Sequence, residues 1–300
     1  MHHNIVRVPG VLGTPTEEPA RGITGLVYRS IRGVTRLVGG GIDAAFAPLV
    51  ALLGDTSGAS SAERDAVLAA LNGVLGDHLA ASGNPLAISM RLRSEGEPTG
   101  KILLLAHGLC LNDRQWRLEG HDHGAALAAD AGFTPVYLHY NSGLSVSTNG
   151  RILAQSMERL YDAWPVPIER LVMVGHSMGG LVARSAIHHG ALIQRGGLRW
   201  PARVNDLVCL GTPHQGAPLE RAGQGVDLLL GAAPYAAPLA RLGKVRSAGI
   251  NDLRLGNIVS APSGDDGTHR CAAVPLPEGT RCFAIAASLG PPTPSLKSKL

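Results

Sequence analysis

The stretch Arg170-Leu-Val-Met-Val-Gly-His-Ser-Met-Gly-Gly-Leu-Val-Ala-Arg184 decides the fold. Near its start, Leu171 to Val174 form an apolar run typical of a strand buried on both faces of a parallel sheet. From Leu181 onward, the apolar residues have the spacing of a helix. Between them, residues 175–179 match the pattern G-x-S-x-G. A strand, an abrupt turn and a helix form the context in which that pattern indicates a nucleophilic serine.

The turn predicts a strained backbone at Ser177. Small residues on either side let the strand and the helix pass closely, and the turn lifts the serine hydroxyl above the sheet. Its oxygen then lies at a helix N-terminus, where developing negative charge is stabilised. A second glycine, Gly180, fits this close approach. The alternative interpretation is an ordinary glycine-rich turn without chemistry.

Composition is compatible with one large α/β domain and a smaller appendage. Of the 300 residues 45% are apolar, which is enough for a substantial core. The formal net charge is +4, but the basic residues are mixed with acidic ones and form no run interleaved with aromatic residues. We therefore expect no nucleic-acid partner.

The cysteines and the start of the chain indicate a reducing compartment. The spacing of Cys110, Cys209, Cys271 and Cys282 contains no C-x-x-C, and Cys209 and Cys282 lie in apolar runs. Buried free thiols are the favoured interpretation, with one disulfide as the alternative. The first residues lack the pattern of a secretion signal. No run reaches the roughly eighteen apolar residues that a membrane-spanning helix needs, so a cytoplasmic location is expected.

Three regions are expected along the chain. Residues 1–21 predict a flexible arm and residues 22–85 a helical segment. Residues 86–300 predict the α/β domain, with a cap or lid at about residues 218–279. The apolar residues of this cap suit either a pocket for an acyl chain or simple core packing.

The helical segment allows two interpretations. Residues 22–53 carry apolar residues at helical spacing, with arginines on another side. This pattern fits packing against the α/β domain or a partner subunit. It also fits peripheral contact with a membrane surface. A further helix is expected near Ser60, because Ser60 and Glu63 form a capping box.

The rest of the chain predicts strands that alternate with helices of about ten to fifteen residues. This alternation predicts an α/β fold with a mostly parallel sheet and helices on both faces. Beyond the strand and helix around Ser177, strands are expected at residues 86–93, 101–106, 134–140, 204–210 and 280–288, and helices at residues 125–131 and 150–164.

The stretch Gly120-His-Asp-His-Gly124 has the composition of a metal site. Two histidines one residue apart share a side only in a strand, whereas a helix is expected to begin here. Asp122 is better explained as the N-cap of that helix. We expect no metal and no cofactor.

The residues after the predicted strand 101–106 suggest an oxyanion hole. Gly108 allows close approach to a substrate, and the backbone N–H of Leu109 is expected to point at its carbonyl oxygen. The second donor is the N–H of Met178, directly after the serine. The side chain of His107 either lines the site or is a satisfied loop residue.

Two further histidines are candidates for lining the site. His176 lies directly before the serine. His214 ends the stretch Gly211-Thr-Pro-His214 after the predicted strand 204–210, at the edge of the sheet where sites of open α/β folds lie.

The motifs at residues 175–180, 107–108 and 211–214 together resemble the α/β-hydrolase superfamily. Within it, the chain is similar to bacterial lipases and to esterases like the GPI inositol-deacylases, over about residues 86–290. The resemblance implies a serine esterase or lipase that acts on a small-molecule or lipid carboxylic ester. It implies Ser177 as the nucleophile, with the backbone groups of Leu109 and Met178 as the oxyanion hole.

The acid and base of a catalytic triad are missing from their expected places. Their order in this superfamily is Ser, acid, His, but no Asp, Glu or His follows Ser288. The preferred interpretation is an incomplete chain that lacks the last strand and helix, with the acid and base beyond Leu300. A rearranged pair of His269 with Asp265 or Asp266 is the second interpretation. The third is a non-catalytic binding or scaffold protein, because losing the base lowers the rate by about 10⁴–10⁶.

Overall fold

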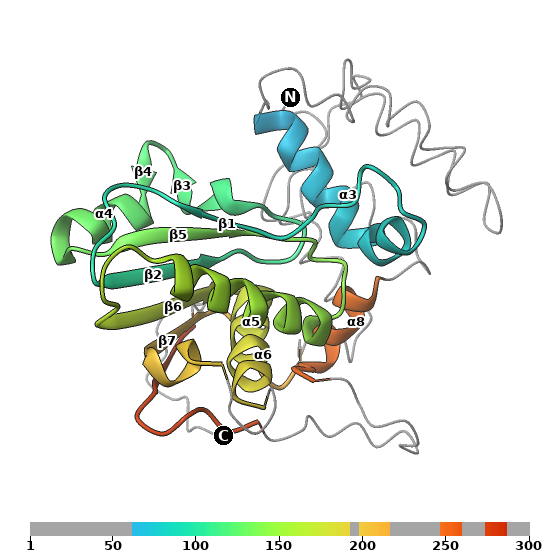
Figure 1. Ribbon diagram of the computed structural model, residues 1–300. Coiled ribbons are helices and arrows are strands. Elements are labelled where there is room, and N and C mark those ends of the chain that lie inside the picture. The colour runs from blue at the N-terminus through green and yellow to red at the C-terminus, as the bar shows by residue number, and fades with distance from the viewer. Residues whose placement is uncertain (1–61, 193–197, 217–246, 260–273, 287–300) are drawn as a thin grey trace, which may run out of the picture.

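The computed structural model describes residues 62–192, 198–216, 247–259 and 274–286. A six-stranded sheet with the strand order β1-β5-β2-β6-β7-β8 lies at its centre (Figure 1). β1 is antiparallel to β5, and every other neighbouring pair in this sheet is parallel. The predicted α/β class with a mostly parallel sheet is confirmed.

The strands follow the short apolar runs of the sequence. The central strands β2 and β6 are buried along nearly their whole length, as expected where helices cover both faces of a sheet. The main sheet consists of β1 (Arg91–Ser94), β2 (Lys101–Ala106), β5 (Thr134–His139), β6 (Arg170–His176), β7 (Val204–Leu210) and β8 (Arg281–Ile285). A separate hairpin is formed by β3 (Arg117–Leu118) and β4 (His121–Asp122).

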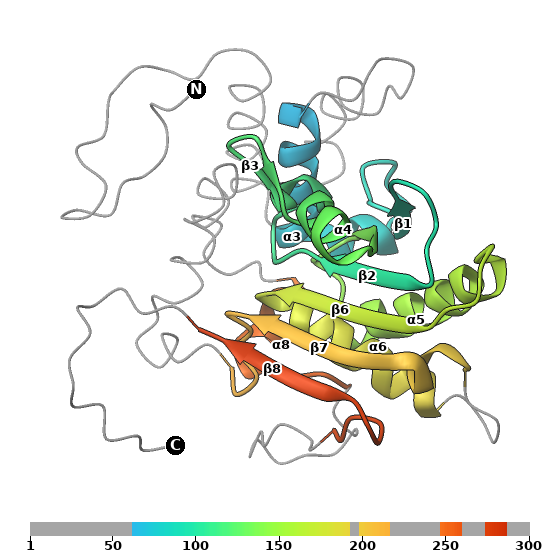
Figure 2. The same ribbon diagram turned by 90° about the vertical axis from the view of Figure 1, so that its left-hand side faces the viewer.

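Helices cover both faces of the sheet (Figure 2). The described helices are α3 (Ala62–Ala81), α4 (His123–Ala131), α5 (Val146–Ala163), α6 (Met178–Leu192) and α8 (Ala248–Leu255), with short 3-10 turns η2 (Asp113–Trp116) and η3 (Trp200–Arg203). Helices α3, α5, α6 and α8 bury apolar residues in the larger core on one face. Helix α4 lies on the other face, where its Gly124 contacts Tyr137 and Leu105 of the smaller core.

Helix α3 is part of the main hydrophobic core. Its Leu71 and Leu75 are buried in the same cluster as Ile102 and Leu104 of β2. The predicted helix ahead of the sheet is therefore confirmed, and its buried residues belong to the same core as the central strand β2.

The first predicted strand has the wrong start. It was expected at residues 86–93, but β1 begins at Arg91. The Asn72 side chain of α3 donates to Leu86 O at 2.8 Å and accepts from the N–H of Ile88 at 2.9 Å. These two bonds hold the chain against α3 before it enters the sheet.

Capping residues set two helix starts. The helix expected at residues 150–164 begins at Val146, because the Ser145 side chain accepts a hydrogen bond in its first turn. That prediction of the start was wrong. The prediction of Asp122 as an N-cap is confirmed, since its Oδ1 accepts from the N–H of Ala125 at 3.0 Å.

Several predictions fall outside the described residues. These are the arm at 1–21, the helices at 22–53, Ser60 of the capping box and most of the cap region 218–279. The described part of the cap includes α8, which contacts α3 and α5. No helix in the described ranges is long and apolar enough to cross a membrane.

The prediction of buried free thiols is confirmed at Cys110 and Cys209. It is wrong for Cys282, which is free but exposed. Cys282 lies on β8, the last strand of the sheet, where all five residues are exposed. Cys271 lies outside the described residues.

Candidate active site

Ser177 lies at the sharp turn between β6 and α6. Its φ is 51°, in the left-handed region that residues other than glycine rarely enter. Its N–H donates to Leu210 O of β7 at 2.8 Å, and α6 begins at the next residue, Met178. The side chain is partly exposed. The strained turn that the motif predicts is therefore present, with the hydroxyl-bearing residue at the carboxyl end of the sheet.

Glycines let β6 and α6 approach at this turn. A Cβ at Gly175 would clash with the backbone of Gly180, and a Cβ at Gly179 would lie 2.6 Å from His107 O. A Cβ essentially never comes this close to another heavy atom. The close approach of strand, helix and the neighbouring β2 loop therefore requires residues without side chains.

The loop after β2 packs against the serine. A Cβ at Gly108 would lie 3.2 Å from Ser177 Cβ, so the backbone of this loop passes directly beside the Ser177 turn. Within the described part of the chain, the N–H of Leu109 has no hydrogen-bond acceptor. The N–H of Met178 belongs to the first residue of α6, where amide groups lack an acceptor within the helix.

Gln115 of η2 connects this loop to the Ser177 turn. Its Oε1 accepts from the N–H of Gly108 at 3.2 Å, and its Nε2 lies 2.9 Å from Nδ1 of His176. Sequence reasoning missed this residue. No local pattern marks it, because its second partner lies 61 positions away along the chain.

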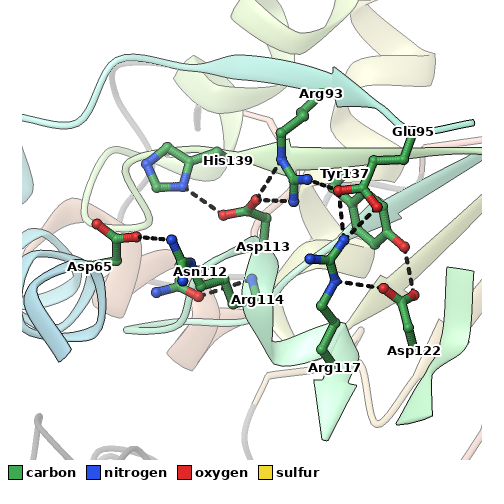
Figure 3. A network of polar contacts seen from close by, with 10 residues as sticks. All are labelled: Asp65, Arg93, Glu95, Asn112, Asp113, Arg114, Arg117, Asp122, Tyr137 and His139. Atoms are coloured by element: carbon green, nitrogen blue, oxygen red, sulfur yellow. Dashed lines mark hydrogen bonds and ion pairs between the residues drawn. The ribbon is translucent and has the colours of Figure 1, made fainter. Parts of the chain in front are cut away.

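A polar network anchors η2 to the sheet (Figure 3). Asp113 lies between His139 and Arg93, with its Oδ1 3.1 Å from His139 Nδ1 and its Oδ2 2.7 Å from Arg93 Nη2. Burial raises the pKa of the Asp113 carboxyl, but the hydrogen bonds from His139 and Arg93 outweigh burial and hold that pKa well below its usual range. Asp113 is therefore a charged anchor for the loop.

The same network continues to the β3–β4 hairpin (Figure 3). Arg117 bridges Glu95 and Asp122, with its Nε 2.6 Å from Asp122 Oδ2. The Tyr137 hydroxyl of β5 donates to Asp122 Oδ1 at 2.6 Å. Exposed ion pairs contribute little free energy individually, but these contacts fix where the hairpin lies on the sheet.

Helix α3 packs against the loop that follows β2. Cys110 has a φ of 59°, and its N–H donates to Ser142 Oγ at 3.0 Å. A Cβ at Gly73 of α3 would lie 2.9 Å from Cys110 Cα. The residue after Leu109 is therefore wedged between α3 and the loop that follows β5.

A comparison with protein families shows to which family the sequence belongs. The sequence matches the PGAP1-like α/β domain over residues 97–261, more than half of the 300 residues. This span includes both the loop after β2 and the turn at Ser177. The chain belongs to the PGAP1-like α/β domain family. The resemblance to the α/β-hydrolase superfamily is thereby confirmed.

Solved structures give more distant matches to this PGAP1-like chain. The mature lipase BlEst2 of Bacillus licheniformis has a TM-score of 0.39 at 21% identity, over 56% of this chain and 61% of the lipase. A carboxylesterase of the thaumarchaeon Nitrososphaera gargenis has a TM-score of 0.35 at 15% identity, over 67% of this chain and 76% of the esterase. A search of curated proteins found no match. The PGAP1-like chain thus covers less than two thirds of the lipase.

His107 lies in the core of the PGAP1-like domain. Its ring is fully buried and stacks on Tyr140 at a centroid distance of 4.3 Å. Its Nδ1 is 2.9 Å from Gly108 O. Burial lowers the pKa of His107 to about 3, so the imidazole is neutral at neutral pH. The ring therefore packs beneath the loop after β2 as part of the core.

The two other candidate lining histidines are partly buried. Burial lowers the pKa of His176, which contacts Gln115. Burial and then the charge of Arg184 lower the pKa of His214. The Arg184 guanidinium donates to His214 Nδ1 at 3.2 Å, which ties the loop after β7 to α6.

The predicted base and acid candidates, His269, Asp265 and Asp266, lie outside the described residues. Among the described residues, no hydrogen bond joins Ser177 Oγ to a histidine or a carboxylate. The described His139–Asp113 pair lies at the end of β5, which β2 separates from β6. No His, Cys, Asp and Glu group within the described ranges could hold a metal ion.

Proposed function

We propose that this chain is a serine esterase that hydrolyses carboxylic esters of small molecules or lipids. The observation that carries the proposal is the turn at Ser177. A serine at positive φ is fixed between a strand and a helix, with Gly108 packed against its Cβ. That arrangement, in a PGAP1-like α/β domain, fits a nucleophile elbow next to an oxyanion hole.

In the proposed reaction, Ser177 Oγ attacks the ester carbonyl carbon and its proton passes to a base. The carbonyl oxygen becomes an oxyanion that the N–H groups of Leu109 and Met178 stabilise, a contribution of about 2.7–4 kcal/mol per donor. The alcohol then leaves with a proton, and an acyl ester remains on the serine. Water hydrolyses this acyl-enzyme and releases the acid.

The base and acid of this reaction remain part of the proposal. A serine hydroxyl at neutral pH is a poor nucleophile and needs a base that is oriented by an acid. We propose that they are either His269 with Asp265 or Asp266, or another pair that the described residues do not include. His269→Ala distinguishes the two, because it lowers the rate of serine labelling by about 10⁴-fold only if His269 is the base.

A fluorophosphonate probe tests the nucleophile. It should label the chain at one residue, Ser177, and Ser177→Ala should abolish the labelling. Ser156→Ala is the matched control, since Ser156 lies on α5 and bonds only to the exposed Arg159 among the described residues. Its labelling should equal that of the unmodified chain.

Ester turnover tests the substrate class. Matched ester, thioester and amide substrates with the same acyl group should show preference for the ester. The alternative is a binding protein that keeps the fold without turnover. Absence of labelling and turnover, together with saturable binding of a lipid ester, would replace the esterase proposal with this one.

A further inference from the structure

The side chain of Gln115 forms a bridge between two backbone turns. One end contacts the N–H of Gly108, at 3.2 Å, and the other contacts His176 Nδ1, at 2.9 Å. The first turn carries the proposed oxyanion donor Leu109. The second carries Ser177. Gln115 is therefore the described side chain that hydrogen-bonds to both halves of the proposed site.

The hydrogen-bond partners settle how the amide is oriented. A backbone N–H can only donate, so the end of Gln115 that faces Gly108 must be the oxygen. The NH₂ end then faces His176, and an NH₂ group can only donate. His176 Nδ1 must therefore accept and carry no proton. The neutral ring has its proton on Nε2.

Gly108 needs such a restraint because of its own chemistry. A Cβ at this position would lie 3.2 Å from Ser177 Cβ, a tight contact that glycine avoids, and glycine has the most flexible backbone of all residues. A rotation about Gly108 would redirect the N–H of Leu109, the next amide in the chain. Both polar groups of Gly108 are held, its N–H by Gln115 and its oxygen by the His107 ring.

We propose that Gln115 is a positioning residue, which sets the direction of the Leu109 N–H relative to Ser177 by tying Gly108 to His176. This rests on the proposed function of those two groups. The backbone that carries Gln115 is itself fixed. Asp113, which lies in the same η2 turn, binds Arg93 of β1. The bridge therefore transmits the position of the anchored turn to the nucleophile.

The surroundings of His176 suit an accepting nitrogen. Its Nδ1 contacts the neutral amide of Gln115, and the ring of His107, which interacts with it electrostatically, is fully buried and neutral. Burial lowers the pKa of His176, so its ring stays unprotonated at neutral pH and keeps the bond from Gln115.

The first test measures the rate at which a fluorophosphonate labels Ser177. Gln115→Met keeps the length of the side chain and removes both hydrogen bonds, and it should slow labelling about tenfold through misplacement of the donor. Gln155→Met on the exposed face of α5 is the matched control and should label at the unmodified rate. Unchanged labelling of a folded Gln115→Met chain would overturn the proposal.

The second test reads the ring of His176 directly, by NMR of a ¹⁵N-histidine chain with His176→Phe to assign the signal. The unmodified chain should show the Nε2–H tautomer. Gln115→Glu keeps an acceptor for Gly108 but sets a carboxylate against Nδ1. It should therefore raise the pKa of His176, while Gln115→Met should not. An Nδ1–H tautomer in the unmodified chain would overturn the bridge.

The two tests separate this inference from the proposed function. If the unmodified chain is not labelled but His176 shows the Nε2–H tautomer and the pKa response to Gln115→Glu, the esterase proposal fails and the bridge stands. If the chain is labelled but Gln115→Met has no effect, the positioning role fails and the esterase proposal stands.

Discussion

At position 179 a side chain would have to occupy the space of two carbonyl oxygens. A Cβ there meets the oxygens of Ala106 and His107, which belong to the backbone of β2 and its loop and cannot move aside. We expect Gly179→Ala to lower the free energy of unfolding by about 1–3 kcal/mol. Urea denaturation measures this change.

Gly180→Ala is the comparison for that prediction. A Cβ at Gly180 would clash with the side chain of Thr212, and a substitution can shorten that side chain. The loss of stability in Gly180→Ala should therefore be relieved by adding Thr212→Ala, whereas no side-chain change should relieve Gly179→Ala. A Gly179→Ala chain as stable as the unmodified one would show that β2 and α6 are farther apart than described.

The buried ring of His107 makes stability depend on pH. Its pKa falls from the usual 6.5 to about 3 on folding, chiefly through burial. Below pH 6.5 the unfolded chain binds a proton that the folded chain does not, so stability is lost as the pH falls toward 3. This one group changes the free energy of unfolding by at most about 1.36 kcal/mol per pH unit.

His107→Phe removes that titration while keeping an aromatic ring beside Tyr140. We expect a flatter decline of unfolding free energy between about pH 6 and 4 than in the unmodified chain, measured by denaturation at a series of pH values. His188→Phe, at a partly exposed ring, should change the slope less. Equal slopes for His107→Phe and the unmodified chain would contradict the burial of a neutral ring.

Single residues differ in how far the sequence predicts them. The strained turn at Ser177 follows from a five-residue pattern, because its geometry depends on immediate neighbours. The cap role of Asp122 is equally local. Gln115 could not be found this way, since its proposed role depends on a contact with His176 at the end of the neighbouring strand β6, 61 positions away along the chain. The same holds for His107, whose buried ring stacks on the distant residue Tyr140.

At the scale of elements, α3 and the loop after β2 depend on each other. Gly73→Ala favours the helix by about 1 kcal/mol of intrinsic propensity. However, the new Cβ would lie 2.9 Å from Cys110 Cα and press on the loop. We expect the labelling rate of Ser177 to fall several-fold, because the shifted loop carries Leu109. Labelling kinetics at equal folded fraction measure this effect.

Gly76→Ala gives the matched control on the same helix. Its Cβ meets the side chain of Asn141, in the loop after β5 rather than the loop after β2. It should lower stability without the same loss of labelling rate. Adding Cys110→Gly to Gly73→Ala should restore labelling, since it removes both the thiol and the strain of a φ of 59°. Failure of this rescue would argue against α3 as the support.

The sequence predicts the order of the described elements well because apolar runs and helical spacing repeat regularly. The ends of the elements were less predictable. Val146 starts α5 because Ser145 caps it, and β1 starts late because Asn72 holds the preceding chain. Both effects come from one or two side-chain hydrogen bonds, to which a pattern of apolar residues is insensitive.

At the scale of the whole molecule, β8 is the exposed end of the sheet. Its Phe283 and Ile285 are 45% and 56% exposed. An exposed apolar edge strand tends to associate with another chain. We expect Ile285→Lys to reduce self-association of the 300-residue chain, as measured by sedimentation velocity over a concentration series.

Leu127→Lys on α4 is the control for that experiment, because Leu127 is also exposed, at 40%, but lies on a helix. It should change self-association less. A chain that remains monomeric at every concentration without any substitution would show that β8 does not drive association.

The organisation of the whole chain was predictable only in part. The alternation of elements gives the sheet, and the motifs around Ser177 give the family resemblance, since both are written in continuous segments. The base and acid of a triad meet the serine only through the tertiary fold. His269 and Asp265 are therefore candidates on spacing alone, and the described residues do not test them.

The reactivity of the Cys110 thiol can report how often the loop after β2 separates from α3. Burial strongly raises the pKa of its thiol, so the closed loop contains almost no thiolate to react with an alkylating reagent. Alkylation at this residue must await a moment when the loop separates from α3. The frequency of that separation, read from the rate of thiol modification, would reveal how often the proposed oxyanion donors lose their alignment in solution.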